Sequence, residues 1–161
     1  LLTDYRDMQG QFDHIVSVEM FEAVGERWWP TYFRALKRLL KPGGQAIVQV
    51  ITIDDALFQR YRRGTDFIQR HIFPGGMLPS PGAFCSRAQR AGLAVVDDFA
   101  FGAHYARTLG LWHDTFCERL LEVKAQGFDD RFIRLWRFYL AYCEAGFRAG
   151  SIDVHQFTLQ A

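Results

Sequence analysis

The sequence lacks several features that would assign it at once to a common class of protein. Its 161 residues include three cysteines, which are odd in number and form no CxxC pair, so neither a disulfide framework nor a structural zinc site is indicated. The simplest explanation of these cysteines is that the protein resides in a reducing compartment. No apolar run approaches the roughly 20 residues that a membrane-spanning helix needs. The formal net charge is only +1, which gives no reason to expect a nucleic-acid partner.

Two further absences concern the start of the chain. No GxGxxG turn follows a first strand, and no P-loop is present. The first residues, LLTDYRDMQG, contain neither an initiator Met nor a signal-peptide pattern. If the chain has a nucleotide-binding fold, we therefore expect the half that cradles the cofactor to be missing from it.

The first part of the chain has the pattern of a βαβ unit. FDHIVSVEM, residues 12–20, has a β-branched apolar centre and predicts a buried strand. Residues 26–40 place apolar side chains at helical spacing, and KPGG at 41–44 ends that helix. QAIVQVITI, residues 45–53, predicts a second buried strand. The order of these elements implies a parallel strand pair with a right-handed crossover.

The remainder of the chain is also mixed in pattern, so the fold class is α/β. A helical segment at 54–72 is interrupted near Gly64 and is followed by the Pro/Gly-rich loop FPGGMLPSPG. The further expected elements are a short helix over 80–92, a third strand over 93–101, helices over roughly 109–126 and 129–149, and a last edge or antiparallel strand over 152–161.

Each of the three predicted strands has polar side chains within it or directly after it. Glu19 and Glu22 come after the first strand, Gln49 lies in the second, and Tyr105 follows the third. In open α/β sheets, ligands bind beyond the carboxyl ends of the strands, so Glu22, Gln49 and Tyr105 are expected at one edge. Each residue also has a purely structural explanation. Glu22 can belong to a solvated strand end, Gln49 can be a core amide with its hydrogen bonds satisfied, and Tyr105 can pack on its own helix.

Two helical segments carry features that suggest a lipid partner. Arg60, Arg62 and Arg63 lie on an interrupted helix that also bears aromatic residues, a pattern compatible with an anionic lipid surface and equally with a solvated face. The helix over 129–149 has a broad aromatic stripe, for which core packing is the default explanation.

The chain resembles the cyclopropane-fatty-acyl-phospholipid synthase family, which includes the mycolic acid cyclopropane synthases. The similar segments, in order, are FDHIVSVEMFEAVG, YFRALKRLLKPGG, TDFIQRHIFPGGMLPS, HYARTLGLW and AGFRAGSIDVHQ, and together they extend over essentially the whole chain. The resemblance implies the C-terminal portion of a Rossmann-like class I methyltransferase sheet, with an antiparallel last strand and helical lid inserts. Residues 1–161 would then be the C-terminal part of a single methyltransferase domain.

The resemblance also implies roles for individual residues. It assigns to a bicarbonate ion the side chains of Glu22 and Tyr105 and the backbone of Ile51. Gln49 occupies the position of a family histidine, and an amide can donate a hydrogen bond but cannot relay a proton. The expected neighbours of S-adenosylmethionine are Tyr5, Arg6, Ser17 and Val18. The expected neighbours of the lipid are Phe73, Tyr139, Arg60, Arg62 and Arg63.

The function that the resemblance implies is S-adenosylmethionine-dependent methylation of unsaturated acyl chains of phospholipids, which forms cyclopropane fatty acids. Such an enzyme would be cytoplasmic and peripherally associated with the inner face of the membrane, with a homodimer as one possible assembly and no metal. The isolated chain is expected to bind the cofactor weakly or not at all and to be inactive. Two alternatives stay open: a related methyltransferase with a methyl-branched or other product, for which Gln49 is the discriminating feature, and a non-catalytic lipid-binding α/β module.

Overall fold

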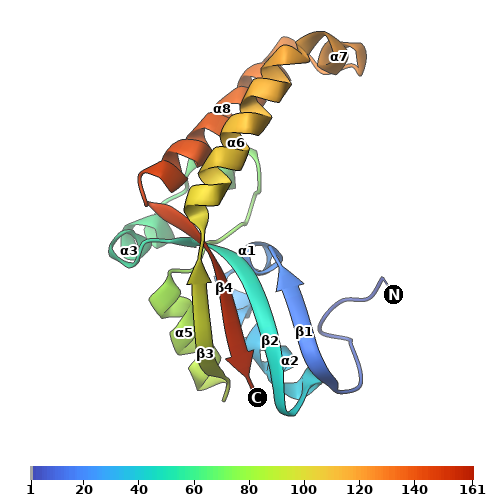
Figure 1. Ribbon diagram of the computed structural model, residues 1–161, viewed down its shortest axis with the longest axis vertical. Coiled ribbons are helices and arrows are strands. Elements are labelled where there is room, and N and C mark those ends of the chain that lie inside the picture. Colours follow the sequence, from blue (N-terminus) through green and yellow to red (C-terminus); the bar gives the residue numbers. More distant parts are fainter. Residues whose placement is uncertain (1) are drawn as a thin grey trace. The chain divides into compact units, whose positions relative to one another are not determined.

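The computed structural model describes residues 2–161, which form two compact units (Figure 1). The first unit has two segments, one that ends at Ala100 and a second, Val154–Ala161. The second unit is Phe101–Asp153. The elements of the first unit are β1 (Phe12–Val18), α1 (Phe21–Val24), the 3-10 turn η1 (Glu26–Trp28), α2 (Trp29–Leu39), β2 (Leu40–Ile53), α3 (Asp55–Arg63), α4 (Phe67–His71), α5 (Pro81–Arg90), β3 (Ala94–Ala100) and most of β4 (Ile152–Gln160).

A four-stranded sheet in the order β1-β2-β4-β3 forms the centre of the first unit. β1 and β2 are parallel, with Val18 opposite Gln49, which confirms the predicted βαβ unit. β4 is antiparallel to β3, and its arrow runs opposite to those of β1 and β3 in Figure 1. The antiparallel alternative for the last strand is therefore correct, whereas the edge alternative is wrong because β4 lies between β2 and β3.

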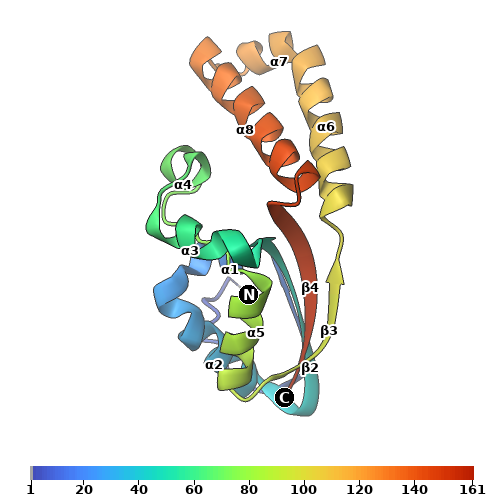
Figure 2. The ribbon, with the colours of Figure 1, turned by 90° about the vertical axis from the view of Figure 1, so that its left-hand side faces the viewer.

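One face of the sheet is covered by α2 and α5 (Figure 2). Pro30 occupies the first turn of α2, where its missing N–H costs no hydrogen bond, and the apolar side of this helix is buried. Phe84 of α5 stacks on Phe157 of β4 with 4.3 Å between ring centroids. Aromatic rings thus connect the helix layer to the sheet in this core.

The prediction that the first strand is buried is wrong. Side chains alternate between the two faces of a strand, and Val16 and Val18 point away from α2 and α5. Their exposed fractions are 68% and 58%, and Ile47 on the neighbouring strand is 41% exposed. The burial of β1 is confined to the face that the helices cover.

The structure also corrects the reading of KPGG as a separate helix stop. α2 ends at Leu39, and β2 already begins at Leu40, so these four residues are the first part of the strand. Gly43 has φ 78°, a conformation that glycine adopts without strain. The register between β1 and β2 shifts here, between Phe12 and His14. The glycines accommodate an irregular start of the strand.

The second unit consists of α6 (Gly102–Glu118), α7 (Leu120–Ala125) and α8 (Asp130–Arg148), with α6 and α8 side by side in Figures 1 and 2. α6 begins earlier than the predicted helix, so His104 and Tyr105 lie in its first turns and not in a loop. The physical reason is a hydrogen bond of 2.6 Å from the Gly102 backbone N–H to the Asp153 carboxylate, which satisfies a group that a helix start leaves unpaired.

Candidate active site

Glu22 is held at the carboxyl end of β1 by the short helix α1. Its neighbour Phe21 is fully buried and contacts Trp29 and Tyr32 at ring-centroid distances of 5.2 and 4.9 Å. The Glu22 carbonyl oxygen accepts a 2.9 Å hydrogen bond from the backbone N–H of Met77, which ties α1 to the loop before α5. The aromatic contacts and the backbone bond together fix the position of the Glu22 side chain.

The two carboxylate oxygens of Glu22 have different surroundings. Oε1 accepts a 2.6 Å hydrogen bond from the backbone N–H of Ile51, whereas Oε2 is buried and has no hydrogen-bond partner within residues 2–161. Burial, as the largest effect, raises the pKa of this carboxyl above its ordinary value, and the nearby Glu19 carboxylate adds to the rise. An unpaired buried carboxylate oxygen is costly, and it marks a place where a hydrogen-bond donor fits.

Gln49 joins two other side chains in a chain of hydrogen bonds across the sheet. Its amide nitrogen donates to Glu19 Oε1 at 2.9 Å, and its carbonyl oxygen accepts from the Gln156 amide nitrogen at 2.9 Å. Gln49 is half-buried, and both ends of its amide have hydrogen-bond partners. Glu19 has φ 50°, an uncommon conformation for a residue other than glycine, and its backbone N–H donates to the Gln49 carbonyl oxygen.

The residues proposed for the cofactor are partly brought together. The Tyr5 ring packs edge-on against the buried Tyr32 ring at 5.7 Å, and the Tyr32 hydroxyl donates to the Ser17 hydroxyl oxygen at 2.8 Å. Tyr5 and Ser17 are thus connected through Tyr32, a residue that sequence reasoning did not select. Val18 follows Ser17 with an exposed side chain. The guanidinium of Arg6 is engaged by Asp4.

The residues proposed for the lipid have different environments in the first unit. Arg62 forms a 2.7 Å ion pair with Glu26, so its charge is largely compensated. Arg60 and Arg63 are exposed on α3. Phe73 is 57% exposed in the loop after α4. Arg60, Arg62 and Arg63 therefore do not form a uniform set of unpaired cations.

Tyr105 and Tyr139 both belong to the helical unit. The Tyr105 ring contacts Phe101 and Phe147 at centroid distances of 5.7 and 5.6 Å. Tyr139 packs on Trp136 at 4.9 Å, on one side of an open groove of about 570 Å³ between the helices of this unit. The expected meeting of Tyr105 with Glu22 and Gln49 stays a prediction.

Sequence reasoning missed Gln156 and the pair formed by His155 and Asp98. The alternation in β4 places Gln156 on the face opposite Phe157, but no sequence signal joins it to Gln49, 107 residues earlier. His155 Nδ1 lies 2.5 Å from Asp98 Oδ1. Within residues 2–161, no group of three His, Cys, Asp or Glu side chains could hold a metal ion, and no helix is long and apolar enough to cross a membrane.

Comparison with known proteins identifies the family. The family model for mycolic acid cyclopropane synthetase matches residues 1–157. The chain belongs to this family. Tuberculostearic acid methyltransferase of Mycobacterium tuberculosis is 49% identical over 159 residues, which are 98% of this chain and 37% of that protein. Cyclopropane-fatty-acyl-phospholipid synthase of Escherichia coli is 37% identical over 161 residues, which are 97% of this chain and 39% of that protein.

Solved structures of a family member and of a more distant methyltransferase have the same fold. A mycolic acid cyclopropane synthase in complex with SAH and CTAB matches all of this chain and 59% of its own, with a TM-score of 0.89 and 30% identity. A putative sarcosine dimethylglycine methyltransferase from Galdieria sulphuraria has a TM-score of 0.77 at 18% identity, covering 98% of this chain and 57% of its own, and shares the fold alone. The predicted methyltransferase fold class is confirmed. The chain itself spans well under half the length of the curated relatives above.

Proposed function

We propose that the protein is an S-adenosylmethionine-dependent methyltransferase that modifies unsaturated acyl chains of phospholipids and forms cyclopropane fatty acids in lipid biosynthesis. The observation that carries this proposal is the Glu22 carboxyl, which is buried at the carboxyl end of a parallel strand pair with Oε2 unpaired. A cofactor and a reacting acyl chain would meet at such an edge. The family membership and the relatives named above support the reaction class.

The proposed cofactor supplies an electrophilic methyl group when it is bound. Tyr5 and Ser17 are connected through Tyr32, and Val18 adjoins them, which fits a surface for a nucleoside beside the end of β1. Arg6 also adjoins Tyr5, but its charge is engaged by Asp4, so it would shape this surface through its position more than through its charge. SAH in the similar structure supports the assignment.

The residues around Glu22 also fit the proposed bicarbonate ion, which would supply a base. Glu22 Oε2 is an unpaired acceptor for the hydroxyl of such an ion. Gln49, Ile51 and Tyr105 are the further residues proposed to hold the ion. The Ile51 N–H already donates to Glu22, so Ile51 would act on the ion through the carboxylate that it orients.

The chain's residues would serve two steps of the reaction. An alkene is a weak nucleophile, so holding the acyl chain in line with the methyl group in a dry site supplies much of the acceleration. The attack leaves positive charge on an acyl carbon. The proposed role of aromatic side chains, among them Phe73, Tyr105 and Tyr139, is to stabilise that charge. A cyclopropane forms when the new methyl group loses a proton and that electron pair closes the ring.

A methyl-branched product is a second candidate, because Gln49 replaces an ionisable side chain in the position that the resemblance assigns to a histidine. The Gln49 amide is bonded at both ends, to Glu19 and Gln156, so it neither accepts a proton nor turns freely. Loss of a proton from a neighbouring chain carbon would give a branched alkene, which becomes a saturated branch only with a hydride donor. The 49% identical tuberculostearic acid methyltransferase supports this candidate.

The proposed place of action is the cytoplasmic side of a membrane, with peripheral association. Arg60 and Arg63 on α3 are exposed and would contribute to the approach to anionic lipid, whereas Arg62 is paired with Glu26. A homodimer is a possible assembly.

The test uses the full-length polypeptide, S-adenosylmethionine with an isotopically labelled methyl group, and unsaturated phospholipid in detergent micelles. Mass analysis of the lipid is expected to show one methyl-derived carbon per modified chain, and its absence from every lipid would refute the proposal in favour of a non-catalytic lipid-binding module. The Gln49→His variant discriminates between the two products. A shift of the product from branched alkene to cyclopropane would support the second candidate, whereas a cyclopropane from the unmodified protein would support the first.

A further inference from the structure

The outer side of α2 forms one wall of a groove with a cluster of cations among its lining residues. This basic groove has a volume of about 520 Å³. Its lining residues are Arg6, Thr31, Arg34, Ala35, Lys37, Arg38 and Ala91. Four of the seven are positively charged and none is acidic, although the whole chain has a net charge of only +1. The concentration of positive charge is therefore local.

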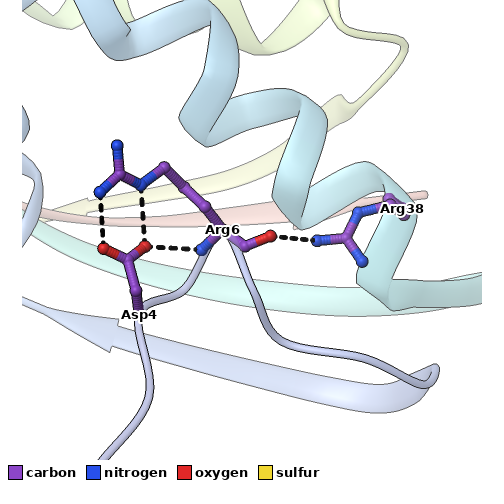
Figure 3. A network of polar contacts seen from close by, with 3 residues as sticks. All are labelled: Asp4, Arg6 and Arg38. Carbon is purple, nitrogen blue, oxygen red and sulfur yellow. Dashed lines mark hydrogen bonds and ion pairs between the residues drawn. The ribbon is translucent and has the colours of Figure 1, made fainter.

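Two of the cations are fixed in place by the segment before β1 (Figure 3). Arg38 donates from one terminal nitrogen to the Met8 carbonyl oxygen at 2.8 Å and from the other to the Arg6 carbonyl oxygen at 3.2 Å. The Arg6 guanidinium forms two hydrogen bonds to Asp4, of 2.9 and 2.7 Å, and these bonds lower the pKa of Asp4 to about 2. Hydrogen bonds thus fix the segment before β1 against α2, so the groove is preorganised.

The remaining cations have no anionic partner in the part of the chain that the structure describes. Arg34 donates to the hydroxyl of Thr31 at 3.1 Å, which is a neutral partner. No carboxylate of residues 2–161 lies within ion-pair distance of Arg34, Lys37 or Arg38. Arg34 lies three residues before Lys37 and four before Arg38, so the three side chains share one face of the helix.

The helix dipole explains only part of this arrangement. Cations are favoured in the last turn of a helix, which accounts for Lys37 and Arg38. It does not account for Arg34 in the middle of α2, and Arg6 on the neighbouring segment is already paired with Asp4. Like charges gathered around one groove repel each other, and an anion that occupied the groove would relieve that repulsion.

We propose that the basic groove binds the phosphate of an anionic phospholipid headgroup and so docks the protein on the bilayer that contains its substrate. Guanidinium groups present planar pairs of N–H donors that match phosphate oxygens, and an ammonium group adds a strong point charge. Arg34 and Lys37 provide the uncompensated charges, and Arg38 keeps spare N–H donors beside them. The bilayer as the source of the phosphate rests on the proposed function, whereas binding of phosphate in the groove does not.

The experiment measures the association of the full-length protein with vesicles of phosphatidylcholine that contain increasing amounts of phosphatidylglycerol. The Arg34→Gln/Lys37→Gln variant is expected to bind anionic vesicles about 30-fold more weakly, from about 1 kcal/mol for each cation near the surface. The matched control, Arg131→Gln/Arg134→Gln, removes two exposed charges from α8 and is expected to bind like the unmodified protein. Inorganic phosphate should compete, and association should weaken with salt.

Two outcomes would overturn the proposal, and a parallel activity measurement separates it from the proposed function. Equal binding of the Arg34/Lys37 variant and the control would overturn it. If the groove bound inorganic phosphate but the protein did not bind anionic vesicles, a phospholipid headgroup would be overturned as the source of the phosphate. Methyl transfer to detergent-dispersed substrate is measured in parallel and should be unchanged in the Arg34/Lys37 variant. Absence of transfer in every variant would refute the proposed function while groove-dependent vesicle binding still supported the docking site.

Discussion

The backbone N–H of Ile51 on β2 donates a 2.6 Å hydrogen bond to Oε1 of Glu22, which lies in α1, the short helix after β1. Two neighbouring parallel strands thereby determine the orientation of one buried carboxyl. The same bond leaves Oε2 buried and unpaired, so the carboxyl presents a single acceptor toward the edge of the sheet. The arrangement separates a structural oxygen from one that is available for a ligand.

The first prediction concerns Glu22→Gln, which keeps the shape and the bond to Ile51 but removes the charge. Methyl transfer is expected to fall by roughly 10²-fold or more, the range for loss of a group that positions or transfers a proton. The measurement is the initial rate on detergent-dispersed unsaturated phospholipid at a fixed cofactor concentration. Full activity of this variant would remove Glu22 from the mechanism.

For Glu22→Gln we also expect a change in the free energy of unfolding that depends on pH. The pKa of Glu22 is raised in the folded state, so its contribution to stability is fully present below the ordinary carboxyl pKa and is lost as the pH rises through the raised value. Glutamine does not ionise, so Glu22→Gln should be more stable than the unmodified protein at pH 7, and the difference should vanish near pH 4. Each unit of pKa shift corresponds to about 1.4 kcal/mol. Thermal unfolding from pH 4 to pH 8 measures the effect, and a pH-independent difference would contradict it.

The second prediction concerns the hydrogen-bond chain from Glu19 through Gln49 to Gln156. Gln156→Leu removes the donor to the Gln49 carbonyl oxygen and lets the amide turn, so the ratio of products is expected to change with a loss of about 1 kcal/mol of stability. Gln160→Leu is the matched control, because it lies on the same face of β4 without a bond to Gln49. The two products have the same formula, so the ratio is measured by mass analysis with a cofactor whose methyl group is fully deuterated: the cyclopropane retains only part of that deuterium, and the branched alkene retains all of it. The same ratio in both variants would show that Gln156 does not position Gln49.

The local pattern of the sequence was enough to predict most elements, because each has its own periodicity and end signals. The βαβ unit, the break near Gly64 and the helix α8 all depend on residues close together in the chain. The partner of Gln49 and the start of α6 did not follow from such signals. Gln156 lies 107 residues after Gln49, and Asp153 lies 51 residues after Gly102, so both contacts arise only when distant strands and helices meet.

The sequence pattern also could not predict which side chains of a strand are exposed. An apolar strand such as FDHIVSV indicates that its side chains can be buried, but it does not say which faces are covered. In the structure, helices cover only one face of β1, and Val16 and Val18 are exposed on the other. At the strand end, Glu19 contacts Gln49 and Glu22 contacts Ile51, whereas the joint site of Glu22, Gln49 and Tyr105 stays a prediction.

The third prediction concerns Phe21, the aromatic residue that anchors α1. Its fully buried ring contacts four other aromatic rings, so Phe21→Ala is expected to cost about 3–5 kcal/mol of unfolding free energy. Phe21→Leu keeps an apolar side chain and should cost much less. Because Glu22 is the next residue, both variants should lose more activity than Leu2→Ala, which changes an exposed side chain. Denaturant unfolding and the initial rate measure the two effects, and equal losses of stability for Phe21→Ala and Phe21→Leu would contradict the anchoring role.

The last prediction concerns Gly102 at the start of α6. A Cβ atom at this position would lie 2.5 Å from the Asp153 carboxylate oxygen that accepts the Gly102 N–H, and 3.0 Å from the Phe147 ring. Gly102→Ala is therefore expected to destabilise the protein by roughly 1–3 kcal/mol, because the carboxylate must move and the N–H loses its partner. Gly110→Ala in the same helix is the matched control. There a Cβ atom would lie 3.3 Å from the flexible end of Glu144, and alanine should stabilise the helix by up to about 1 kcal/mol. Opposite signs for the two variants in denaturant unfolding are the expected result, and a stabilising Gly102→Ala would show that the contact with Asp153 does not determine where α6 begins.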